Sequence, residues 1–506
     1  MAPQYVTPGV YVEELPSGPP PIQRSPTAVT AFIGAAERGP VEKPRSIFGL
    51  GDFERDFGQV DGWPLAQAVH LFFLNGGTRA VVVRVTNDAK TARAALPAGT
   101  DQVKLDASNP GAWGNRLRAG VGHAQTTDPL SFNLRLELQD TGGVTERAEV
   151  HTALSIDPRS PRYLGDVLAS RSALARLAAD ASDAPAARPD ASGSEDGGAP
   201  TLFSDGCDGA AISDAQVSGP DLAGRRGGIW ALDAAGPVNL LCIPPFSQTQ
   251  DVGATTWATA LVYCQQNRIF LLVDPPAAWR TVADVRNGLP QLNVYDANAA
   301  TYWPRILVPS AHAGGPPETL APGGAIAGVY ARTDSARGVW KAPAGTRAQV
   351  RGAVGPATPM SDQDQEILQS VSVNALRTFD QLGTVVWGAR TLAAGTGGNI
   401  YVPVQRTALF LEESVRRGLR WTAFEPNGEA LWAQVRASLT EFLWSLFMDG
   451  AFQGETADQA FFVNCGRETH TADDRRQGRL KMLLGFAILK PAEFELLRIE
   501  LSVQAG

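Results

Sequence analysis

The sequence predicts a multidomain protein of mixed α/β and α+β class, with a mostly-β domain inserted into its α/β core. Three observations predict it. In the core, an apolar helical pattern at 63–75 precedes AVVVRV (80–85), whose β-branched residues hardly alternate, as in a sheet covered on both faces. The helical pattern then largely stops between 88 and 226. The last hundred or so residues carry two long helical patterns followed by short strands.

The order of these patterns divides the chain into five expected parts. At 506 residues the chain is long enough for about three domains of ordinary size. The expected parts are an N-terminal arm with a proline-rich linker (1–26), the first part of the α/β core (27–87), the inserted outer domain (88–226), the second part of the core (227–392) and a C-terminal domain (393–506). Within the insert, 178–200 has no aromatic or branched apolar residue, so we expect a loose loop.

The core elements follow from apolar runs and their period. Short buried strands are predicted at 27–34, 80–85, 238–243, 269–273 and 305–308, with a helix at 254–266. A longer helix is predicted at 364–382, because Val371, Ala375 and Phe379 recur at helical spacing, followed by a strand at 384–387. In the insert, FNLRLEL (132–138) alternates as a half-buried strand does.

The C-terminal domain has the most regular pattern of the chain. A first helix is predicted at 403–417, closed by Gly418. A second covers 429–447, and its apolar residues form one stripe that can pack on a sheet: Leu431, Val435, Leu439, Phe442 and Leu446. Strands at 461–464 and 483–489 and the terminal strand would supply that sheet.

Both ends of the chain have β-strand character. From Phe494 to Val503 apolar and polar residues alternate, and the apolar face consists of Leu497, Ile499, Leu501 and Val503. Near the other end, Val10, Tyr11 and Val12 form a short β-prone piece before a proline-rich stretch. We interpret both as strands that add to the sheets of neighbouring subunits. The alternative is that both fold back as edge strands of their own subunit.

Composition excludes several classes of function. The chain is 44% hydrophobic and 19% charged, as soluble globular proteins are. Its net charge of −8 argues against a nucleic-acid partner, which would require a basic surface. No apolar stretch approaches the roughly 18 residues of a membrane span, so direct membrane insertion is not expected either. The partners are therefore expected to be proteins.

No motif predicts a metal, a cofactor or a disulfide framework. The four cysteines are scattered, no histidine pair has metal-ligand spacing, and the phosphate-loop pattern G-x-x-x-x-G-K-[ST] is absent. The first residues, MAPQYVTPGVYVEEL, lack the basic and apolar regions of a secretory signal. We therefore expect a protein without cofactors that is made and assembled in the cytoplasm with reduced thiols.

Several runs of the sequence resemble contractile tail sheath proteins of tailed phages, tailocins and related bacterial injection systems. The resemblance covers about two thirds of the chain, does not include the insert, and is strongest at the C-terminal end. The runs that carry it are YVTPGVYVEELPSGPPPIQRSPTAVTAFIGAAERGP (5–40), GVYARTDSARGVWKAPAG (328–345), VNALRTFD (373–380), VPVQRTALFLEESVRRGLRWTAFEPNGEALWAQVRASLTEFLWSLFMDGAFQG (402–454), FFVNCG (461–466) and GRLKMLLGFAILKPAEFELLRIEL (478–501).

The resemblance implies a structural subunit rather than an enzyme. Such subunits stack as six-membered rings around an inner tube on a baseplate, meet sheath-terminating proteins, and shorten to drive the tube through a target envelope. It also implies that the C-terminal domain lines the lumen, so Arg416, Arg417 and Arg420 are candidates for contact with acidic residues of the tube. A simpler interpretation is that these arginines only complement the dipole of their helix.

Two alternative functions remain open from sequence. One is a carbohydrate-binding or hydrolytic protein that uses the inserted β domain, with Ser310 and His312 as the residues to test. Asp274 also follows a predicted strand, but it is interpreted as a turn or cap residue. No nucleophile elbow surrounds Ser310, and nothing fixes a triad geometry. The other alternative is a different structural part of the same apparatus, such as a baseplate component.

Overall fold

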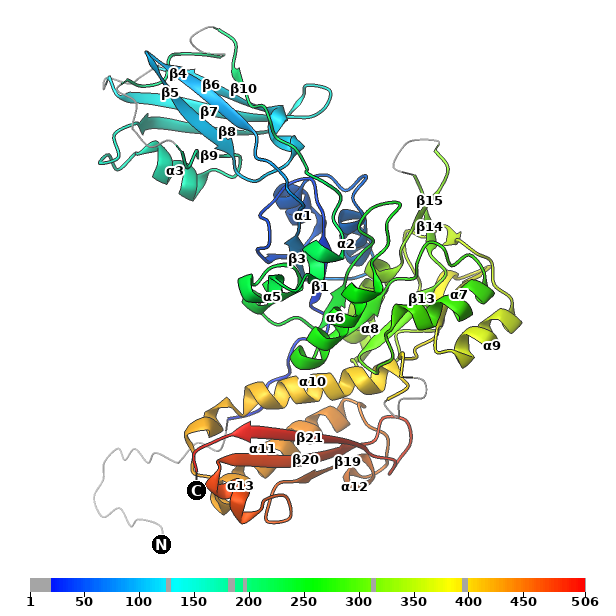
Figure 1. Cartoon of the computed structure of the whole chain (residues 1–506). Coiled ribbons are helices and arrows are strands. Elements are labelled where there is room, and N and C mark those ends of the chain that lie inside the picture. Colours follow the sequence, from blue (N-terminus) through cyan, green and yellow to red (C-terminus); the bar gives the residue numbers. More distant parts are fainter. Residues whose placement is uncertain are drawn as a thin grey trace, which may run out of the picture. The chain divides into compact units, whose positions relative to one another are not determined.

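A computed structural model of the chain describes residues 20–123, 129–180, 187–193, 198–310, 315–393 and 399–505 (Figure 1). The described residues form two compact units. The large unit contains residues 27–337 and 342–402, and the C-terminal unit contains 20–26, 338–341 and 403–505. The second unit thus joins the residues after the N-terminal arm to the C-terminal domain.

The large unit is built on an eight-stranded sheet with the order β18-β17-β13-β12-β11-β1-β3-β2. Neighbouring strands are parallel from β3 to β17, and the two edge strands run antiparallel. The central strands are buried throughout, which confirms the continuous apolar pattern. The strands are β1 (Thr30–Gly34), β2 (Arg45–Ile47), β3 (Ala80–Arg84), β11 (Leu240–Cys242), β12 (Phe270–Val273), β13 (Ala299–Trp303), β17 (Asn374–Phe379) and β18 (Gly383–Trp387).

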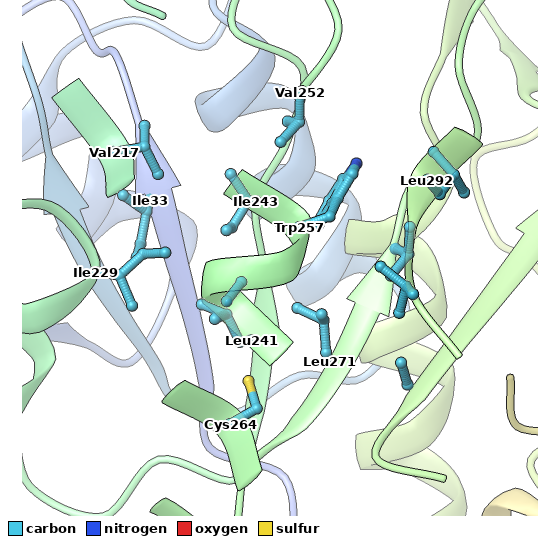
Figure 2. Packing of buried hydrophobic residues seen from close by; sticks show 14 of the residues in the cluster. Ile33, Val217, Ile229, Leu241, Ile243, Val252, Trp257, Cys264, Leu271 and Leu292 are labelled. Carbon is cyan, nitrogen blue, oxygen red and sulfur yellow. The ribbon is translucent and has the colours of Figure 1, made fainter. Parts of the chain in front are cut away.

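Helices pack around this sheet and close its core. Figure 2 shows Ile33, Leu241 and Leu271 of three parallel strands together with Trp257 of α6 and Ile229. The helices are α1 (Leu50–Phe57), α2 (Pro64–Leu74), α4 (Asp214–Ser218), α5 (Leu222–Arg225), α6 (Ala254–Asn267), α7 (Val282–Gly288), α8 (Gly323–Arg337) and α9 (Asp362–Ser370), with 3-10 turns at Gly228–Ala234 and Leu289–Leu292. A small sheet joins β14 (Ile306–Val308), β15 (Glu318–Leu320) and β16 (Gly355–Pro356).

Helices α2 and α8 approach each other closely because α8 carries two glycines on one face. A Cβ atom at Gly324 would lie 2.1 Å from the carbonyl oxygen of Ala68, and one at Gly328 would lie 2.4 Å from that of Phe72. Asn75, just after α2, donates from Nδ2 to the carbonyl oxygens of Leu71 (2.9 Å) and Arg351 (3.0 Å). The pair is therefore fixed by backbone contact and by a buried amide.

The predicted helix at 364–382 is wrong beyond its first half. Helix α9 ends at Ser370, Ser372 has a positive φ of 60°, and the following residues form β17, which pairs with β13 and β18. The residues that suggested a helix are spaced by four, and Ala375 and Phe379 also fall on one face of a strand because four is an even number. Pairing in the sheet decided between the two periods.

The insert is a two-sheet β domain with one helix, α3 (Leu164–Arg171). One sheet has the order β10-β6-β7-β8 and the other β4-β5-β9. Phe132, Leu134, Leu136 and Leu138 of β7 are buried in its core, as the alternation predicted. The strands are β4 (Arg93–Ala98), β5 (Asp101–Ala107), β6 (Leu117–Gly122), β7 (Ser131–Gln139), β8 (Thr145–Ser155), β9 (Ala175–Leu177) and β10 (Thr201–Leu202), and a 3-10 turn spans Ala112–Arg116.

The two ends of the insert lie side by side. The amide of Ala210 donates to the carbonyl oxygen of Asn87 at 2.8 Å. Beyond this point Ile212 and Val217 already pack in the core of the eight-stranded sheet. The insert therefore closes near residue 210, earlier than the expected boundary at Arg226, because the short helices α4 and α5 belong to the core. Of the loop expected at 178–200, residues 181–186 and 194–197 lie outside the described residues.

The C-terminal unit contains a sheet with the order β19-β20-β21 and the long helices α10 and α11. The predicted apolar stripe of α11 is buried, from Leu431 to Leu446. No described helix is long and apolar enough to cross a membrane. The elements are α10 (Val402–Gly418), a 3-10 turn at Arg420–Phe424, α11 (Glu429–Met448), α12 (Ala457–Ala460), β19 (Phe461–Asn464), α13 (Ala472–Arg476), β20 (Arg479–Phe486) and β21 (Glu495–Ser502).

Candidate assembly site

The terminal strand β21 pairs antiparallel with β20 along its whole length, from Glu495 opposite Phe486 to Ser502 opposite Arg479. Its inward face is apolar: Ile499 is 1% exposed, whereas Leu496 on the other face is 58% exposed. The alternation expected from sequence is therefore present. In the isolated chain β21 lies in its own subunit's sheet, as the fold-back alternative expects.

The outer edge of β21 pairs with no other described strand. The amide of Val503 donates to the carbonyl oxygen of Gly478 at 2.8 Å, so the backbone N–H and C=O groups of the odd-numbered residues of the strand point toward β20. The backbone groups of Leu496, Arg498, Glu500 and Ser502 therefore point away from the sheet. After the strand, the amide of Gln504 also points away from β20, and it donates to the carbonyl oxygen of Glu425 at 3.2 Å. The edge offers about seven residues for strand addition, although the carbonyl oxygen of Glu500 within it already accepts from Arg416 Nη1 at 3.2 Å.

The three arginines at the end of α10 do not behave alike. Arg416 bonds within its own chain: Nε donates to Glu412 at 2.8 Å and Nη1 donates to the carbonyl oxygen of Glu500 in β21 at 3.2 Å. Arg417 and Arg420 are exposed, and in the part of the chain that the structure describes neither forms an ion pair. The cluster expected from sequence is therefore divided into one structural arginine and two exposed ones.

The N-terminal strand residues Val10, Tyr11 and Val12 lie outside the described residues. The chain becomes described at Pro20 and runs along the C-terminal unit. There Arg24 forms an ion pair with Asp449 at 2.5 Å, and the amide of Ser25 donates to Ser414 Oγ at 3.0 Å. The segment after the arm is thus attached to α10 and α11, so the arm starts from this unit.

The carboxylate of Asp474 forms ion pairs with two residues of β20, whereas the sequence run Asp473–Arg476 is typical of a solvated loop. Its side chain is almost fully enclosed and accepts from Lys481 Nζ at 2.6 Å and from Arg479 Nη2 at 2.8 Å. The hydrogen bond from Lys481, followed by those from Thr471, lowers the pKa of Asp474. Thr471 and Asp474 form a capping box at the start of α13, so the T-x-x-D spacing was the signal that could have found it.

The residues considered for hydrolysis do not form a described triad. Ser310 Oγ donates to Glu318 Oε1 at 3.4 Å, and His312 lies outside the described residues. Asp274 is buried, and its Oδ1 accepts from the amide of Gly323 at 2.7 Å. Gly323 is the first residue of α8. Asp274 is therefore placed as a helix cap. Across the described ranges, no group of three His, Cys, Asp or Glu side chains could hold a metal ion.

The buried carboxyl of Asp274 makes a pH dependence testable. Burial raises its pKa from 3.8 to about 7, although the Gly323 amide and Arg305 oppose this. Because the folded state holds a proton that the unfolded state releases, the free energy of unfolding falls as pH rises through this window and levels off above it. We expect Asp274 to contribute a loss of about 2 kcal/mol between pH 5 and pH 7, measured as the difference between the wild type and a variant that cannot titrate at this position.

Asp274→Asn keeps an oxygen that can accept from Gly323 but cannot titrate. Urea denaturation at pH 5, 6, 7 and 8 should therefore give a flatter stability profile for this variant than for the wild type. Parallel profiles for the two proteins would show that Asp274 ionises normally.

Comparisons with known proteins agree with this fold. Residues 215–392 match the model of the phage tail sheath protein central domain. A sheath protein in the contracted PVC extracellular contractile injection system is 20% identical, with a TM-score of 0.58, over 98% of both chains. The contracted helical sheath of the anti-feeding prophage is 22% identical, with a TM-score of 0.56, over 98% of this chain and 99% of that chain.

A crystallised relative extends the likeness. The sheath tail protein of Desulfitobacterium hafniense is 14% identical, with a TM-score of 0.61, over 98% of this chain and 100% of that chain. The search of curated protein sequences gave no match. At 14–22% identity, these comparisons show that the chains share a fold. The shared fold includes the insert and the C-terminal unit as well as the matched central domain.

Proposed function

We propose that this chain is the structural subunit of a contractile sheath, because residues 215–392 match the tail sheath central domain and the whole chain has the fold of sheath proteins. The match of the central domain carries this conclusion. Copies would polymerise around an inner tube as stacked six-membered rings and shorten to drive the tube through a target envelope. Negative-stain electron microscopy of the expressed chain tests it: striated tubes are expected, and a chain that stays monomeric at every concentration would contradict it.

The linking strands of this sheath are proposed to be the two chain ends. The N-terminal strand with Val10, Tyr11 and Val12 would add to a neighbour's sheet, and β21 with Leu497, Ile499 and Leu501, followed by Val503, would be exchanged between copies. The exposed outer edge of β21 supports this role. Each backbone hydrogen bond contributes only about 1 kcal/mol, but a strand forms several and buries side chains as well. Such a joint holds while the subunit bodies rotate.

The work of shortening would come from free energy stored at assembly. Rotation of the subunits would bury new surface between neighbours, in the manner of rigid-body transitions at interfaces. This scheme requires no catalytic step in the subunit, and we propose that the chain is not an enzyme. Its partners would be other copies, the inner tube, the baseplate and sheath-terminating proteins, with assembly in the cytoplasm.

The insert is proposed to decorate the outside of the sheath, which leads to an excision experiment. Because Asn87 and Ala210 are hydrogen-bonded neighbours, residues 88–209 can be replaced by a short Gly-Ser linker without separating the strands of the core. We expect the shortened chain to fold and to form tubes of smaller outer diameter, measured by electron microscopy.

A control for this excision retains the insert but weakens its contact with the core. Arg116 pairs with Glu37 across the junction, so Arg116→Ala removes this ion pair and leaves the contacts of Glu146 with Arg38 and Gln59 in place. Tubes should form in both variants. If the excised chain is folded by circular dichroism but forms no tubes, the insert belongs to the lattice and the decorating role is wrong.

A further inference from the structure

We propose that an exposed turn of the C-terminal unit, residues 423–426, inserts Phe424 into a pocket in the large unit of a second copy of this chain, where Glu425 pairs with Arg390. This turn is called the knob below. The inference rests on the proposed function, because it names two surfaces through which copies of a sheath subunit meet.

The knob presents apolar surface to solvent. Phe424 is 80% exposed, more than any other large apolar residue that the structure describes. Ala423 and Pro426 are exposed as well, so the ring of Phe424 is not an isolated apolar side chain. The carboxylate of Glu425 lies between them and forms no ion pair with any described residue. The knob therefore offers a ring and a free negative charge side by side.

The backbone of the knob is held in place within its own unit. The amide of Glu425 donates to the carbonyl oxygen of Thr422 at 3.0 Å, and the carbonyl oxygen of Glu425 accepts from the amide of Gln504 at 3.2 Å. Pro426 favours extended backbone at the residue before it, and Glu425 has φ −95° and ψ 141°. A partner that receives Phe424 thus has little backbone to order, which lowers the entropic cost of binding.

The pocket lies beside β18, the edge strand of the eight-stranded sheet, and has a volume of 400 Å³. Pockets that bind ligands have volumes of about 300–1,000 Å³. Trp387 and Tyr401 line it with aromatic rings, and small residues such as Gly345 and Gly388 leave room between them. All of its lining residues belong to the large unit. The pocket is therefore suited to an aromatic side chain.

Arg390 gives this pocket a positive charge. Its Cζ lies 5.8 Å from the centre of the Tyr401 ring, and its guanidinium forms no ion pair with any described residue. The buried amide of Asn374 fixes the backbone of Arg390: Nδ2 donates to its carbonyl oxygen at 2.8 Å, and Oδ1 accepts from its N–H at 2.7 Å. The guanidinium thus extends from a fixed position and can bind a carboxylate.

Knob and pocket match in chemistry and join two different surfaces. The knob carries a ring next to a carboxylate, and the pocket offers aromatic walls next to a guanidinium. Consecutive Cα atoms are about 3.8 Å apart, so a Phe424 ring in the pocket brings Glu425 to the lining that contains Arg390. A copy that gives its knob to one neighbour still has a pocket for another, and such heterologous contacts close into rings or continue as helices. This property favours a second copy as the occupant.

Four variants of the full chain test the contact: Phe424→Ala, Glu425→Arg, Arg390→Glu, and Glu425→Arg together with Arg390→Glu. The readout is the lowest protein concentration that gives tubes, followed by light scattering and negative-stain microscopy, with circular dichroism to establish folding. Each single substitution should raise that concentration about tenfold or more. The combined charge reversal should return it to within about threefold of the wild-type value.

Met448→Ala and Glu455→Arg are the matched controls in the same unit. Met448 is 67% exposed, and Glu455 is exposed and forms no ion pair with any described residue. Both should assemble like the wild type. Normal assembly of Phe424→Ala, or a folded double reversal that does not recover, overturns the contact while wild-type tubes still support a sheath.

A mixing experiment identifies the occupant without requiring tubes. Full chains with Arg390→Cys are mixed with full chains with Glu425→Cys and treated with a short bismaleimide crosslinker. A crosslinked dimer should form in the mixture and not with either variant alone. If a chain that carries both substitutions crosslinks only within itself, the knob occupies its own pocket and the proposal is wrong. Absence of wild-type tubes at every concentration would instead contradict the sheath function itself.

Discussion

Deleting residues 495–506 is expected to abolish sheath polymers, because it removes β21, which we propose to link neighbouring copies, together with its exposed edge. The deletion leaves β20 without one of its two neighbours, so the monomer also loses cover for Leu484 and Phe486. The measurement is tube formation by electron microscopy, with circular dichroism to establish that the truncated chain is folded. Tubes of normal length from this chain would refute the linking role.

Point substitutions in β21 provide the matched comparison. Ile499→Asp places a charge at a position that is 1% exposed, whereas Leu496→Asp places it on the open face of the same strand, where the side chain is 58% exposed. The first should remove tubes and destabilise the unit by about 3 kcal/mol or more, and the second should leave unfolding nearly unchanged. A synthetic peptide of residues 495–506 should also inhibit wild-type assembly by occupying the site in trans.

Gly324→Ala is expected to destabilise the large unit by about 2 kcal/mol, although alanine is the better helix former. The added methyl group would lie 2.1 Å from the carbonyl oxygen of Ala68, so α8 must move away from α2. That displacement would also strain the contacts of Asn75 and Arg332, since Arg332 Nη1 donates to the carbonyl oxygen of Asn75 at 2.6 Å. Urea denaturation measures the change.

The same substitution at Gly51 is the control. Gly51 lies in α1 of the same unit, is exposed, and has no atom within 4 Å of an added Cβ. Gly51→Ala should therefore stabilise the protein by about 0.5 kcal/mol. The same glycine-to-alanine change is therefore expected to lower the free energy of unfolding at position 324 and to raise it at position 51. Equal effects at the two positions would show that the close approach of α2 and α8 is unimportant.

Much of the fold was predictable from patterns that lie within one element. The unalternating strand at 80–85 needs cover on both faces, the stripe of α11 needs a sheet, and the period-two terminal strand needs a neighbour. Each of these follows from the side chains of a single segment. The change of pattern at 88 likewise marked the start of an inserted β domain.

The candidate site was only partly predictable, because its members come from distant segments. The arginines of α10 were visible as a cluster, but the contact of Arg416 with Glu500 joins positions 84 residues apart. Ser25 lies beside α10 through the hydrogen bond of its amide to Ser414 Oγ, and nothing in its neighbours in sequence marks it. Asp474 could have been found from its capping-box spacing, although not its ion pairs with Arg479 and Lys481.

By itself the sequence determined where apolar faces occur and with which period, since these depend on the order of side chains along one segment. The tertiary structure alone decided between a helix and a strand where the apolar spacing fits both. At 374–379, pairing with β13 selected a strand. It also decided which of the arginines 416, 417 and 420 already bonds within its own chain, where the insert closes, and why α8 carries glycine at 324. These outcomes depend on distances between separate segments, and backbone contacts and buried hydrogen bonds fix them only when the chain is folded.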